Sequence, residues 1–335
     1  MEHFKVHPKT AFEGWYSKFD LPSGGHLALI ICSVPNASKL PPHMVSFTFY
    51  PKSGKPIFQR EHWVSNIERV NTGQGHAFEL RAAGIGVVRT EDDNVSTYEL
   101  KTEEWSFSAK MTKHVPWGAE KSTPEGWLVR LPLPLHWHVN SLGSTCDFQL
   151  EIPSLDLSPA DKKGTAVLHQ EKNWASSFPS AHMWVQARDG DRGICIAGGK
   201  ILGMTAYMLG YRSSDLDLDI IPPYAISVMG LSPFMSVDVD WETRSFSLSV
   251  QSVWKKVVVR AKAPKDKETW FGLGSPFPDG HRPNFCTESF LASVEVEVWE
   301  RSWWGSWKQL RRENFENASL EYGGDLFPER GEKRE

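Results

Sequence analysis

Three consecutive segments decide the fold: "SVDVDW" (236–241), "SFSLSV" (245–250) and "VWKKVVVRAKA" (253–263). In the first two, apolar and polar residues alternate one by one, which places apolar side chains on one face of an extended strand and polar side chains on the other. The tripeptide "ETR" (242–244) makes a tight connection between them. The stretch therefore predicts an antiparallel meander with one face in a core and one face in water.

The same pattern recurs along the chain. "SVEVEVWE" (293–300) has three valines on one face and two glutamates on the other, and "MVSFTFY" (44–50) and "KPIFQREHW" (55–63) flank a Lys-Ser-Gly turn as in a hairpin. The 26 glycines and 22 prolines cluster as turns between short strands. Short helices are expected only near 308–318 and after a turn near 159. We predict an all-β protein of antiparallel sheets that close into barrels or sandwiches, with few short helices.

A domain boundary is expected at "SLDLSPADKKGTA" (154–166), where hydrophobicity falls and turn-forming residues concentrate. The prediction is an N-terminal β domain at 1–158, a C-terminal β domain at 159–330 and a charged tail at 331–335. Each half has a similar short segment near its start, "FEGWYSKF" (12–19) and "EKNWASSF" (171–178). This similarity suits two related domains but is too short to establish a repeat.

The composition is that of a folded globular protein, with 40% hydrophobic and 23% charged residues. A net charge of −4 with interleaved signs argues against a nucleic-acid partner. No apolar run is long enough to span a bilayer, and the first ten residues lack the apolar core of a signal peptide. We therefore expect a cytoplasmic protein without an integral membrane segment; the sequence gives no indication of its oligomeric state.

Cysteine and tryptophan are the informative residue types. Cys32, Cys146, Cys195 and Cys286 form no C-x-x-C pair, so free buried thiols are expected rather than a zinc cluster or a redox couple. The chain has 15 tryptophans, an unusually large number. Tryptophan is costly to bury, because its indole N–H needs a hydrogen-bond partner. So many flat rings suggest apolar cavities that hold a lipophilic ligand.

The segment "LPLHWHVNS" (133–141) carries an H-x-H pair. On a strand His136 and His138 point to the same face and Trp137 to the other. Such a pair can hold a metal, donate a proton near neutral pH, or serve as ordinary structural histidines. No third ligand completes a metal set, so no metal site is predicted and the other two interpretations stay open.

The segment "HQEKNWASSFPSAHMWVQAR" (169–188) carries most of the remaining candidates. In extended conformation Glu171 and Asn173 share one face, and Lys172 and Trp174 share the other. Further along, Met183, Val185 and Ala187 form a packing face, and a mixed polar and aromatic face lies opposite. Such a face is typical of a pocket wall, but an exposed amphipathic strand can show the same mixture by chance. That mixed face consists of His182, Trp184, Gln186 and Arg188.

Glu171 has two open interpretations. Its surroundings can raise its pKa so that it serves as a general acid, or it can pair with Lys172 or Arg188 and only hold a turn. "AFEGWYSKF" (11–19) adds Glu13, Trp15 and Tyr16, with Gly14 permitting a tight entry into a strand. No phosphate loop, nucleophile elbow, dinucleotide fingerprint or H-E-x-x-H motif is present, so no cofactor is predicted.

Taken in order, "FEGWYSKF", "HWHVNSLGS", "HQEKNWASSFPSAHMWVQ", "AGGKILG" (197–203) and "GHRPNFCTESF" (280–290) resemble the tocopherol cyclase-like family. The resemblance extends over nearly the whole chain, and Glu-Lys-Asn-Trp followed by Phe-Pro and a Trp-x-Gln strand is its most specific part. It implies two lipocalin-like (calycin-type) β domains, with a pocket at or near their junction. It also implies cofactor-independent ring closure on a lipophilic polyene or prenylated substrate.

Two chemistries are compatible with this resemblance. Plant members add a phenolic hydroxyl across a prenyl double bond, whereas fungal proteins of related fold close rings by intramolecular [4+2] cycloaddition, the Diels–Alder reaction. Because no plastid-type leader is visible, a Diels–Alderase-type cyclase of specialised (secondary) metabolism is preferred over a vitamin E enzyme. The alternatives are proton-initiated ring closure, alkene hydration and a non-catalytic carrier of a hydrophobic small molecule.

The resemblance and the residue patterns together give a candidate site. Acids or hydrogen-bond donors for catalysis are His136, His138, Glu171, Lys172 and Asn173. Substrate-binding surfaces are Trp15, Tyr16, Trp174, His182, Trp184 and Gln186. The Glu-Lys-Asn-Trp segment can instead be a structural corner that joins the two halves.

Overall fold

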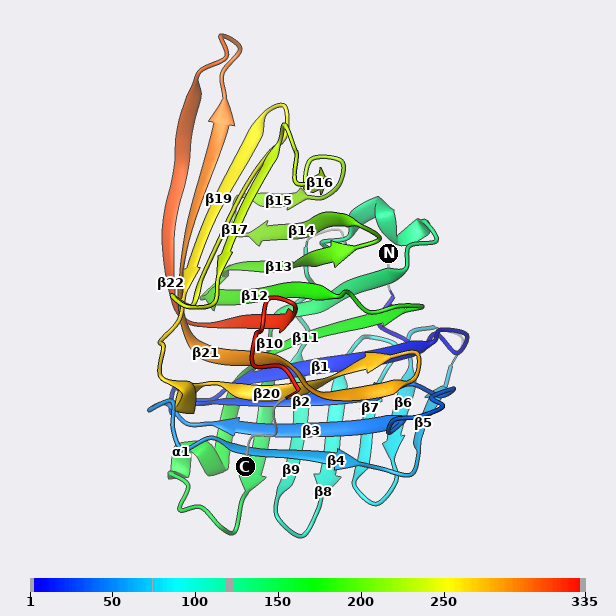
Figure 1. Ribbon diagram of the computed structural model, residues 1–335. Helices are drawn as coiled ribbons and strands as arrows, with labels where there is room; N and C mark the ends of the chain where they lie inside the picture. Colours follow the sequence, from blue (N-terminus) through cyan, green and yellow to red (C-terminus); the bar gives the residue numbers. More distant parts are fainter. Residues whose placement is uncertain (1–2, 74, 119–122, 332–335) are drawn as a thin grey trace. The chain divides into compact units, whose positions relative to one another are not determined.

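The computed structural model describes residues 3–73, 75–118 and 123–331. Strands make up 60% of the chain and helices 4%, which confirms the predicted all-β class. The strands form two antiparallel sheets (Figure 1). In the part of the chain described, no helix has both the length and the apolar character needed to cross a membrane.

The chain divides into two compact units. Unit 1 comprises the chain up to residue 123, residues 128–177 and residues 276–282, and unit 2 comprises residues 124–127, residues 178–275 and the chain from 283 onwards. The units do not divide at the expected position 158/159. Residues 163–175 lie in unit 1 because they form a strand that pairs with the first strand of the chain. Of the expected charged tail, residues 332–335 lie outside the described residues.

Unit 1 contains an eleven-stranded sheet in which the first strand, β1, pairs with the last strand, β11. From β1 the order runs through β2 and β3 to β4, and from β11 it runs back through β10 to β5. The strands are β1 (Phe12–Asp20), β2 (His26–Ser33), β3 (His43–Tyr50), β4 (Phe58–Trp63), β5 (Ile67–Asn71), β6 (Phe78–Ala82), β7 (Gly86–Thr90), β8 (Ser96–Lys101), β9 (Ser106–Lys113), β10 (Leu135–Glu151) and β11 (Lys163–Ala175). The 3-10 helix η1 (Gly126–Arg130) and the helix α1 (Pro159–Lys162) precede β10 and β11 respectively.

Unit 2 repeats this plan, since its first strand β12 pairs with its last strand β22. The meander predicted at 236–263 is confirmed as β17, β18 and β19. The elements are β12 (Ala181–Asp189), β13 (Arg192–Ile201), β14 (Met204–Arg212), β15 (Asp217–Ile220), β16 (Ile226–Val228), β17 (Met235–Asp240), β18 (Ser245–Gln251), β19 (Lys255–Lys262), the 3-10 helix η2 (Lys267–Thr269), β20 (Phe271–Phe277), β21 (Gly280–Arg301) and β22 (Trp307–Gly324).

The helix expected at 308–318 is wrong, because these residues belong to β22. β22 pairs with β21 over most of its length, with Val294 opposite Phe315 and Val296 opposite Glu313. Pairing with a long neighbouring strand satisfies the backbone groups that a helix would have satisfied locally, so tertiary context overrides the helix-forming residues. The short helix expected after the turn near 159 is confirmed as α1.

The two similar segments at 12–19 and 171–178 are not equivalent positions of a repeat. The first forms β1 and the second begins in β11, and these strands are antiparallel neighbours with Gly14 opposite Asn173. The topological counterpart of β1 is β12, since each is the first strand of its unit and pairs with the last.

Each unit has its own hydrophobic core. Trp105 stacks on Phe47 in unit 1 with ring centroids 4.0 Å apart, and Trp241 and Trp270 pack edge-on or tilted against Tyr322 in unit 2. These three tryptophans fill the cores of their units. All four cysteines are free and buried, as expected.

The turn between β20 and β21 belongs to unit 1, where His281 is completely buried. Its Nδ1 donates a hydrogen bond to the carbonyl of Pro41 at 2.9 Å, and the backbone N–H groups of Lys39 and Leu40 donate to Asp279. Burial lowers the pKa of His281 to about 4. The fold therefore requires the neutral imidazole.

We predict a pH-dependent stability that His281 controls. The contribution of neutral His281 is fully present above pH 6.5, the ordinary pKa, and is lost as the pH falls towards 4. His281→Gln, which keeps a donor for Pro41, should reduce the loss of unfolding free energy between pH 7.5 and pH 5 by about 2 kcal/mol. Urea denaturation of both proteins at the two pH values measures this, and an equal loss in both would contradict the assignment.

Candidate functional site

The core face of unit 1 carries one group of candidates. In the β1–β11 register Trp15 lies opposite Lys172 and Glu13 lies opposite Trp174. In the β10–β11 register the two histidines of the H-x-H pair lie opposite the same two β11 residues. Because side chains of directly opposed residues share a face, these strands bring Glu13, Trp15, Lys172, Trp174, His136 and His138 together. The prediction that Lys172 and Trp174 share one face of the strand and Glu171 and Asn173 share the other is confirmed.

A buried ion pair lies at the centre of this face. Lys172 Nζ is 2.6 Å from Glu13 Oε1, and both side chains are 0% exposed. Arg69 of β5 donates to the second carboxylate oxygen at 2.8 Å, and the backbone N–H of His7 donates to the first at 2.6 Å. The Glu13 carboxylate is thus held by two cations and a backbone donor, as a buried charge requires.

The same contacts set the protonation states. Burial alone raises the pKa of the Glu13 carboxyl, but Lys172, His7 and Arg69 together outweigh burial and hold that pKa below its ordinary value. Burial, assisted by the Lys172 charge, lowers the pKa of His7 in spite of its contact with Glu13. Near neutral pH the carboxylate is therefore ionised and the imidazole is neutral.

Lys172 is fixed from several sides. Its ammonium donates to the carbonyl of Lys5 and lies 2.7 Å from Nδ1 of His7, which is also 3.1 Å from Glu13 Oε1. The ammonium also lies 4.6 Å from the centroid of Trp15 and 5.2 Å from that of Trp174. Cation–π attraction to two indoles adds to the ion pair and orients both rings.

Trp174 is the middle of an aromatic stack. His7 lies on it with ring centroids 4.3 Å apart and planes within 7°, and His136 lies 5.0 Å away within 17°. His3 stacks at 5.7 Å and contacts His138 edge-on at 6.3 Å. The resulting surface combines flat apolar rings with several imidazole nitrogens.

Below this stack the core of unit 1 is filled. Gln170 donates to Tyr98 Oη at 2.7 Å and to Ser96 at 3.0 Å, and Asn140 donates to Gln170 at 3.0 Å. A cavity bounded by Trp15, Phe78 and Tyr98, among others, has a volume of about 10 Å³. That is about the space of one water molecule, so this cavity does not hold a polyene.

The opposite face of the same strands carries Tyr16, Glu171 and Asn173. Glu171 pairs with His169, whose Nε2 is 3.0 Å from Oε2 of the carboxylate. Asn173 lies across from Gly14, where an added Cβ would come within 3.0 Å of the Asn173 side-chain oxygen. Gly14 is therefore needed for close approach, in addition to the strand entry expected from the sequence.

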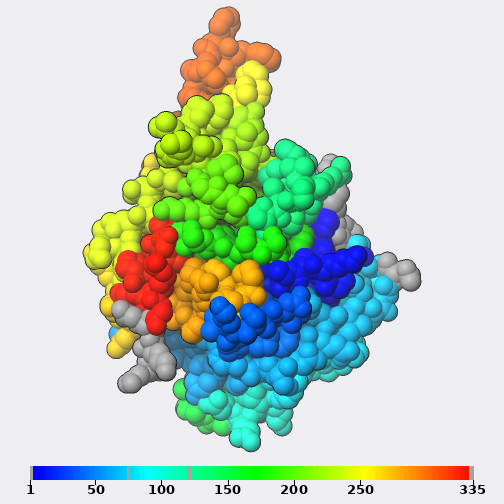
Figure 2. All heavy atoms as spheres, turned by 45° about the vertical axis from the view of Figure 1, so that its right-hand side comes forward, coloured from blue at the N-terminus to red at the C-terminus, as the bar shows by residue number. Residues whose placement is uncertain are grey.

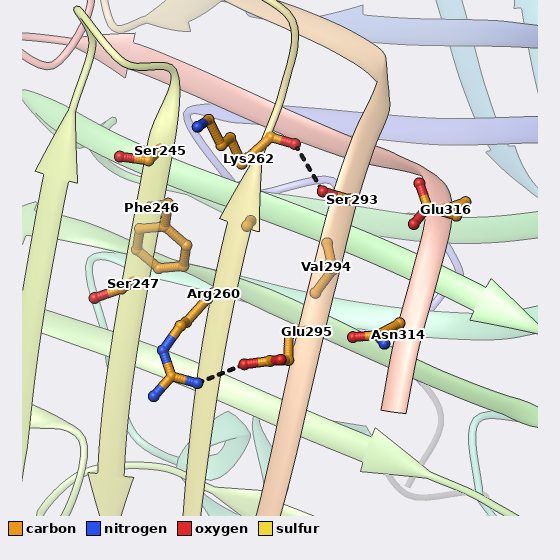
Figure 3. A pocket seen from close by; sticks show the side chains of 11 residues that line it. Ser245, Phe246, Ser247, Arg260, Lys262, Ser293, Val294, Glu295, Asn314 and Glu316 are labelled. Atoms are coloured by element: carbon orange, nitrogen blue, oxygen red, sulfur yellow. Dashed lines mark hydrogen bonds and ion pairs between the residues drawn. The ribbon is translucent and has the colours of Figure 1, made fainter. Parts of the chain in front are cut away.

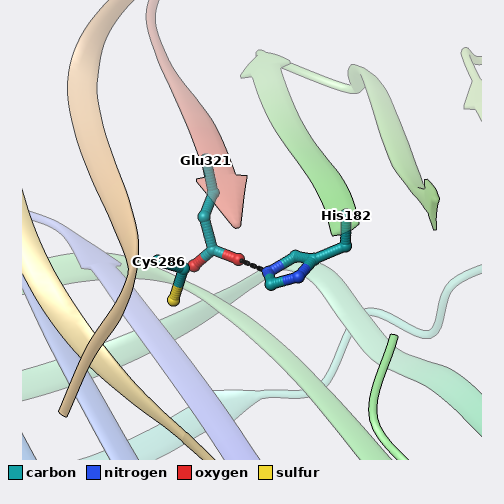
Figure 4. A group of neighbouring side chains, drawn as sticks. All are labelled: His182, Cys286 and Glu321. Atoms are coloured by element: carbon teal, nitrogen blue, oxygen red, sulfur yellow. Dashed lines mark hydrogen bonds and ion pairs between the residues drawn. The ribbon is translucent and has the colours of Figure 1, made fainter. Parts of the chain in front are cut away.

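The remaining candidates belong to unit 2. Met183, Val185 and Ala187 lie in its core, which confirms the predicted packing face, while His182, Trp184 and Gln186 are buried on the other face. His182 Nε2 is 2.7 Å from Glu321 Oε1 of β22 (Figure 4). The His182 ring lies flat against Gly323, where a Cβ would collide with it at 1.9 Å.

His182, Glu321 and Cys286 place their ligand-type atoms within 4.8 Å of one another. Burial raises the pKa of the Cys286 thiol well above its ordinary value, and Ser275 lies 3.5 Å from its sulfur. In this structure the imidazole is hydrogen-bonded to the carboxylate, and the thiol lies beside both groups.

Two surface hollows have mixed polar and apolar linings. One, of about 440 Å³, lies over β18, β19, β21 and β22 and is lined by serines and by charged side chains such as Arg260, which donates to Glu295 at 2.6 Å (Figure 3). The other, of about 500 Å³, lies over β8 to β11 and includes Glu99, Lys110 and Asp147.

The sequence pattern does not point to His7 or Arg69, and it does not assign Glu13 to the site. Glu13 was visible next to Trp15, but its partner Lys172 is distant in the sequence. His7 lies in an irregular segment before β1, and Arg69 lies on a short strand whose pattern gives no sign of a site. Only the pairing of distant strands reveals these three residues.

Comparison with protein-family models gives no match. Among curated proteins, the chain is 22% identical over 253 residues to one from Oryza sativa subsp. japonica named probable tocopherol cyclase, chloroplastic. The chain is therefore similar, at low sequence identity, to a probable tocopherol cyclase. The match covers 70% of this chain, and the chain spans about half the length of this curated relative.

Solved structures extend the likeness to the whole chain. CghA matches with a TM-score of 0.59 at 10% identity, covering 98% of this chain and 95% of CghA. Kievitone hydratase from Nectria haematococca matches with a TM-score of 0.54 at 9% identity, covering 96% of this chain and 91% of that protein. These matches confirm the lipocalin-like fold expected from the family resemblance.

We predict that the Glu13–Lys172 pair is required for stability. Lys172→Met removes one of the two cations that contact the buried Glu13 carboxylate. It should lower the unfolding free energy by about 3 kcal/mol or more. Glu13→Gln combined with Lys172→Met should cost clearly less than the sum of the two single changes. Urea denaturation of the four proteins gives this coupling energy.

Lys255→Met is the matched control. Lys255 lies 2.5 Å from Glu300, but that carboxylate side chain is 50% exposed, so the expected cost is below about 1 kcal/mol. Equal losses for the two lysine variants, or strict additivity at the buried pair, would show that burial of the pair has no special role.

Proposed function

We propose that the protein is a cofactor-independent enzyme that folds a lipophilic polyene or prenylated substrate for ring closure. The observation that carries the proposal is the core-face cluster of unit 1, in which an ion-paired lysine and neutral or hydrogen-bonding imidazoles surround stacked indoles. The similarity to a probable tocopherol cyclase supports the same class of activity. A role in specialised metabolism and a cytoplasmic location stay predictions.

Within this class we favour intramolecular [4+2] cycloaddition. Proton-initiated closure needs a strong acid beside an alkene. At the cluster, Glu13 is kept ionised by its cations and His7 is kept neutral by burial, so neither is poised to protonate a double bond. Cycloaddition needs only a compact substrate conformation and donors that polarise a carbonyl, and it converts π bonds into two new carbon–carbon bonds without gain or loss of atoms.

The proposed roles follow from position. Trp15 and Trp174 supply the surfaces on which the chain folds, and His136, His138 and His7 donate hydrogen bonds. Lys172 has its donors engaged by Glu13, Lys5 and His7, so it acts by positioning the rings. The predicted roles of Tyr16, Glu171, Asn173, His182, Trp184 and Gln186 remain proposals, since these residues lie on other faces.

Proton-driven closure or hydration is the second candidate, and the names of tocopherol cyclase and kievitone hydratase favour it. The His169–Glu171 pair on the opposite face is the group that would serve it. A non-catalytic carrier of a hydrophobic small molecule is the third candidate, and it would use the same aromatic cluster of unit 1.

The test is incubation with two probes, a prenylated hydroquinone and a linear polyene that carries a conjugated diene and an enone, in H2O and in D2O. We expect a cyclic product of unchanged mass from the polyene, without a new carbon–deuterium bond. Gain of one water identifies a hydratase, deuterium on carbon identifies proton-initiated closure, and uncyclised bound probe identifies a carrier. Each of these three results would overturn the preferred function.

Variants then locate the site. Trp174→Ala should lower kcat/KM by about 100-fold, and His7→Ala, His136→Ala and His138→Ala by about 10- to 100-fold each, because each removes a surface or a single hydrogen bond. Glu171→Gln, a change on the opposite face, is the matched control and should alter kcat/KM by less than about threefold. Loss of several orders of magnitude in the control would move the chemistry to Glu171 and to acid catalysis.

A further inference from the structure

The end of the β21–β22 hairpin exposes a group of tryptophans. Trp303 is 89% exposed and Trp304 is 96% exposed, and Trp254 in the neighbouring β18–β19 turn is 47% exposed. The rings of Trp254 and Trp303 lie 5.1 Å apart. In unit 2 this end extends beyond the β18–β19 turn (Figure 1) and forms the orange projection in Figure 2. We call residues 253–256 and 299–308 the tryptophan tip.

The tryptophan tip has an ordered backbone. Ser302 N–H donates to the carbonyl of Ser306 at 2.8 Å, the two serine hydroxyls are 2.7 Å apart, and Gly305 N–H donates back to Ser302 at 2.9 Å. Gly305 has φ 85°, a conformation that an L side chain rarely adopts. Arg301 N–H donates to the carbonyl of Trp254 at 2.8 Å, which ties the turn to its neighbour. The turn therefore holds the two indoles outward in a defined geometry.

Such exposure is unfavourable in water. Indole is among the largest apolar side chains, and contiguous exposed apolar groups of this kind mark binding surfaces. Trp303 and Trp304 pack far less than the buried tryptophans of the same unit, such as Trp270 at 4% exposure. The tip therefore fits an environment that accepts an apolar ring together with its polar N–H.

The charged residues around the tryptophan tip indicate which kind of partner it fits. Lys255, Lys256, Arg301 and Lys308 surround the tryptophans, and Glu300 is the single acidic residue within the tip, paired with Lys255 at 2.5 Å. The chain as a whole carries −4, so this end has the opposite sign. Indoles flanked by lysine and arginine are the combination found where proteins meet an anionic lipid headgroup layer.

We propose that the tryptophan tip docks on an anionic lipid bilayer surface, with Trp303 and Trp304 in the headgroup region and the basic residues against lipid phosphates and carboxylates. The contact is peripheral. It would bring the protein to the phase in which a lipophilic substrate dissolves, a consequence that rests on the proposed function, although the docking itself does not.

Vesicle flotation without any substrate tests this proposal independently of catalysis. Vesicles of phosphatidylcholine with about 30 mol% phosphatidylserine should carry the protein upward and shift its tryptophan emission to the blue, and pure phosphatidylcholine should bind it at least about tenfold more weakly. Trp303→Ser/Trp304→Ser should lower binding to the anionic vesicles at least about tenfold. Circular dichroism confirms that the variant is folded.

Met229→Ser/Leu231→Ser is the matched control, because these side chains are 90% and 79% exposed in another turn of unit 2. It should bind like the unaltered protein. The proposal would be overturned if the unaltered protein does not float with the anionic vesicles. It would also be overturned if the tryptophan variant floats as well as the unaltered protein, or if the control variant loses as much binding as the tryptophan variant. Sedimentation of the vesicle-free proteins is the last check: if the tryptophan variant converts a dimer to a monomer, the tip contacts a second copy of the chain and not lipid.

Discussion

A buried ion pair between Glu13 and Lys172 connects the first strand of unit 1 to its last strand. Both side chains are excluded from water, so each charge depends on the other and on the groups around them. Arg69 from β5 and His7 from the segment before β1 complete the arrangement. Four separate parts of the chain must therefore be in place before the pair is satisfied.

The pair also sets the charge states of the groups around it. An ammonium held against a carboxylate is positioned between two indoles, and it lies beside an imidazole whose own pKa is lowered by burial and by that charge. The result is an aromatic cluster with a neutral His7 and an ionised Glu13 carboxylate. These charge states are the reason why we propose substrate folding in place of proton delivery.

Strand pairing explains why the candidates separate as they do. In each unit the first strand pairs with the last, so residues far apart in sequence become direct neighbours. Alternation then assigns Lys172 and Trp174 to the core face of unit 1 and Glu171 and Asn173 to the other. One sequence segment thus contributes side chains to both faces of the sheet. Whether a residue is at an odd or an even position in the strand decides on which face its side chain lies.

The sequence by itself determined the all-β class, the positions of most strands and the faces of 171–174 and 182–188, because alternation is a local property with a period of two residues. It also predicted the H-x-H pair on a common face, since that rests on the same period. Only the tertiary structure decided that Glu13 meets Lys172, that His7 lies on Trp174, and that 308–318 is a strand. Those outcomes depend on the register between strands that are distant in the sequence. Hydrogen bonds and packing between the strands set that register as the chain folds, so no local sequence pattern predicts it.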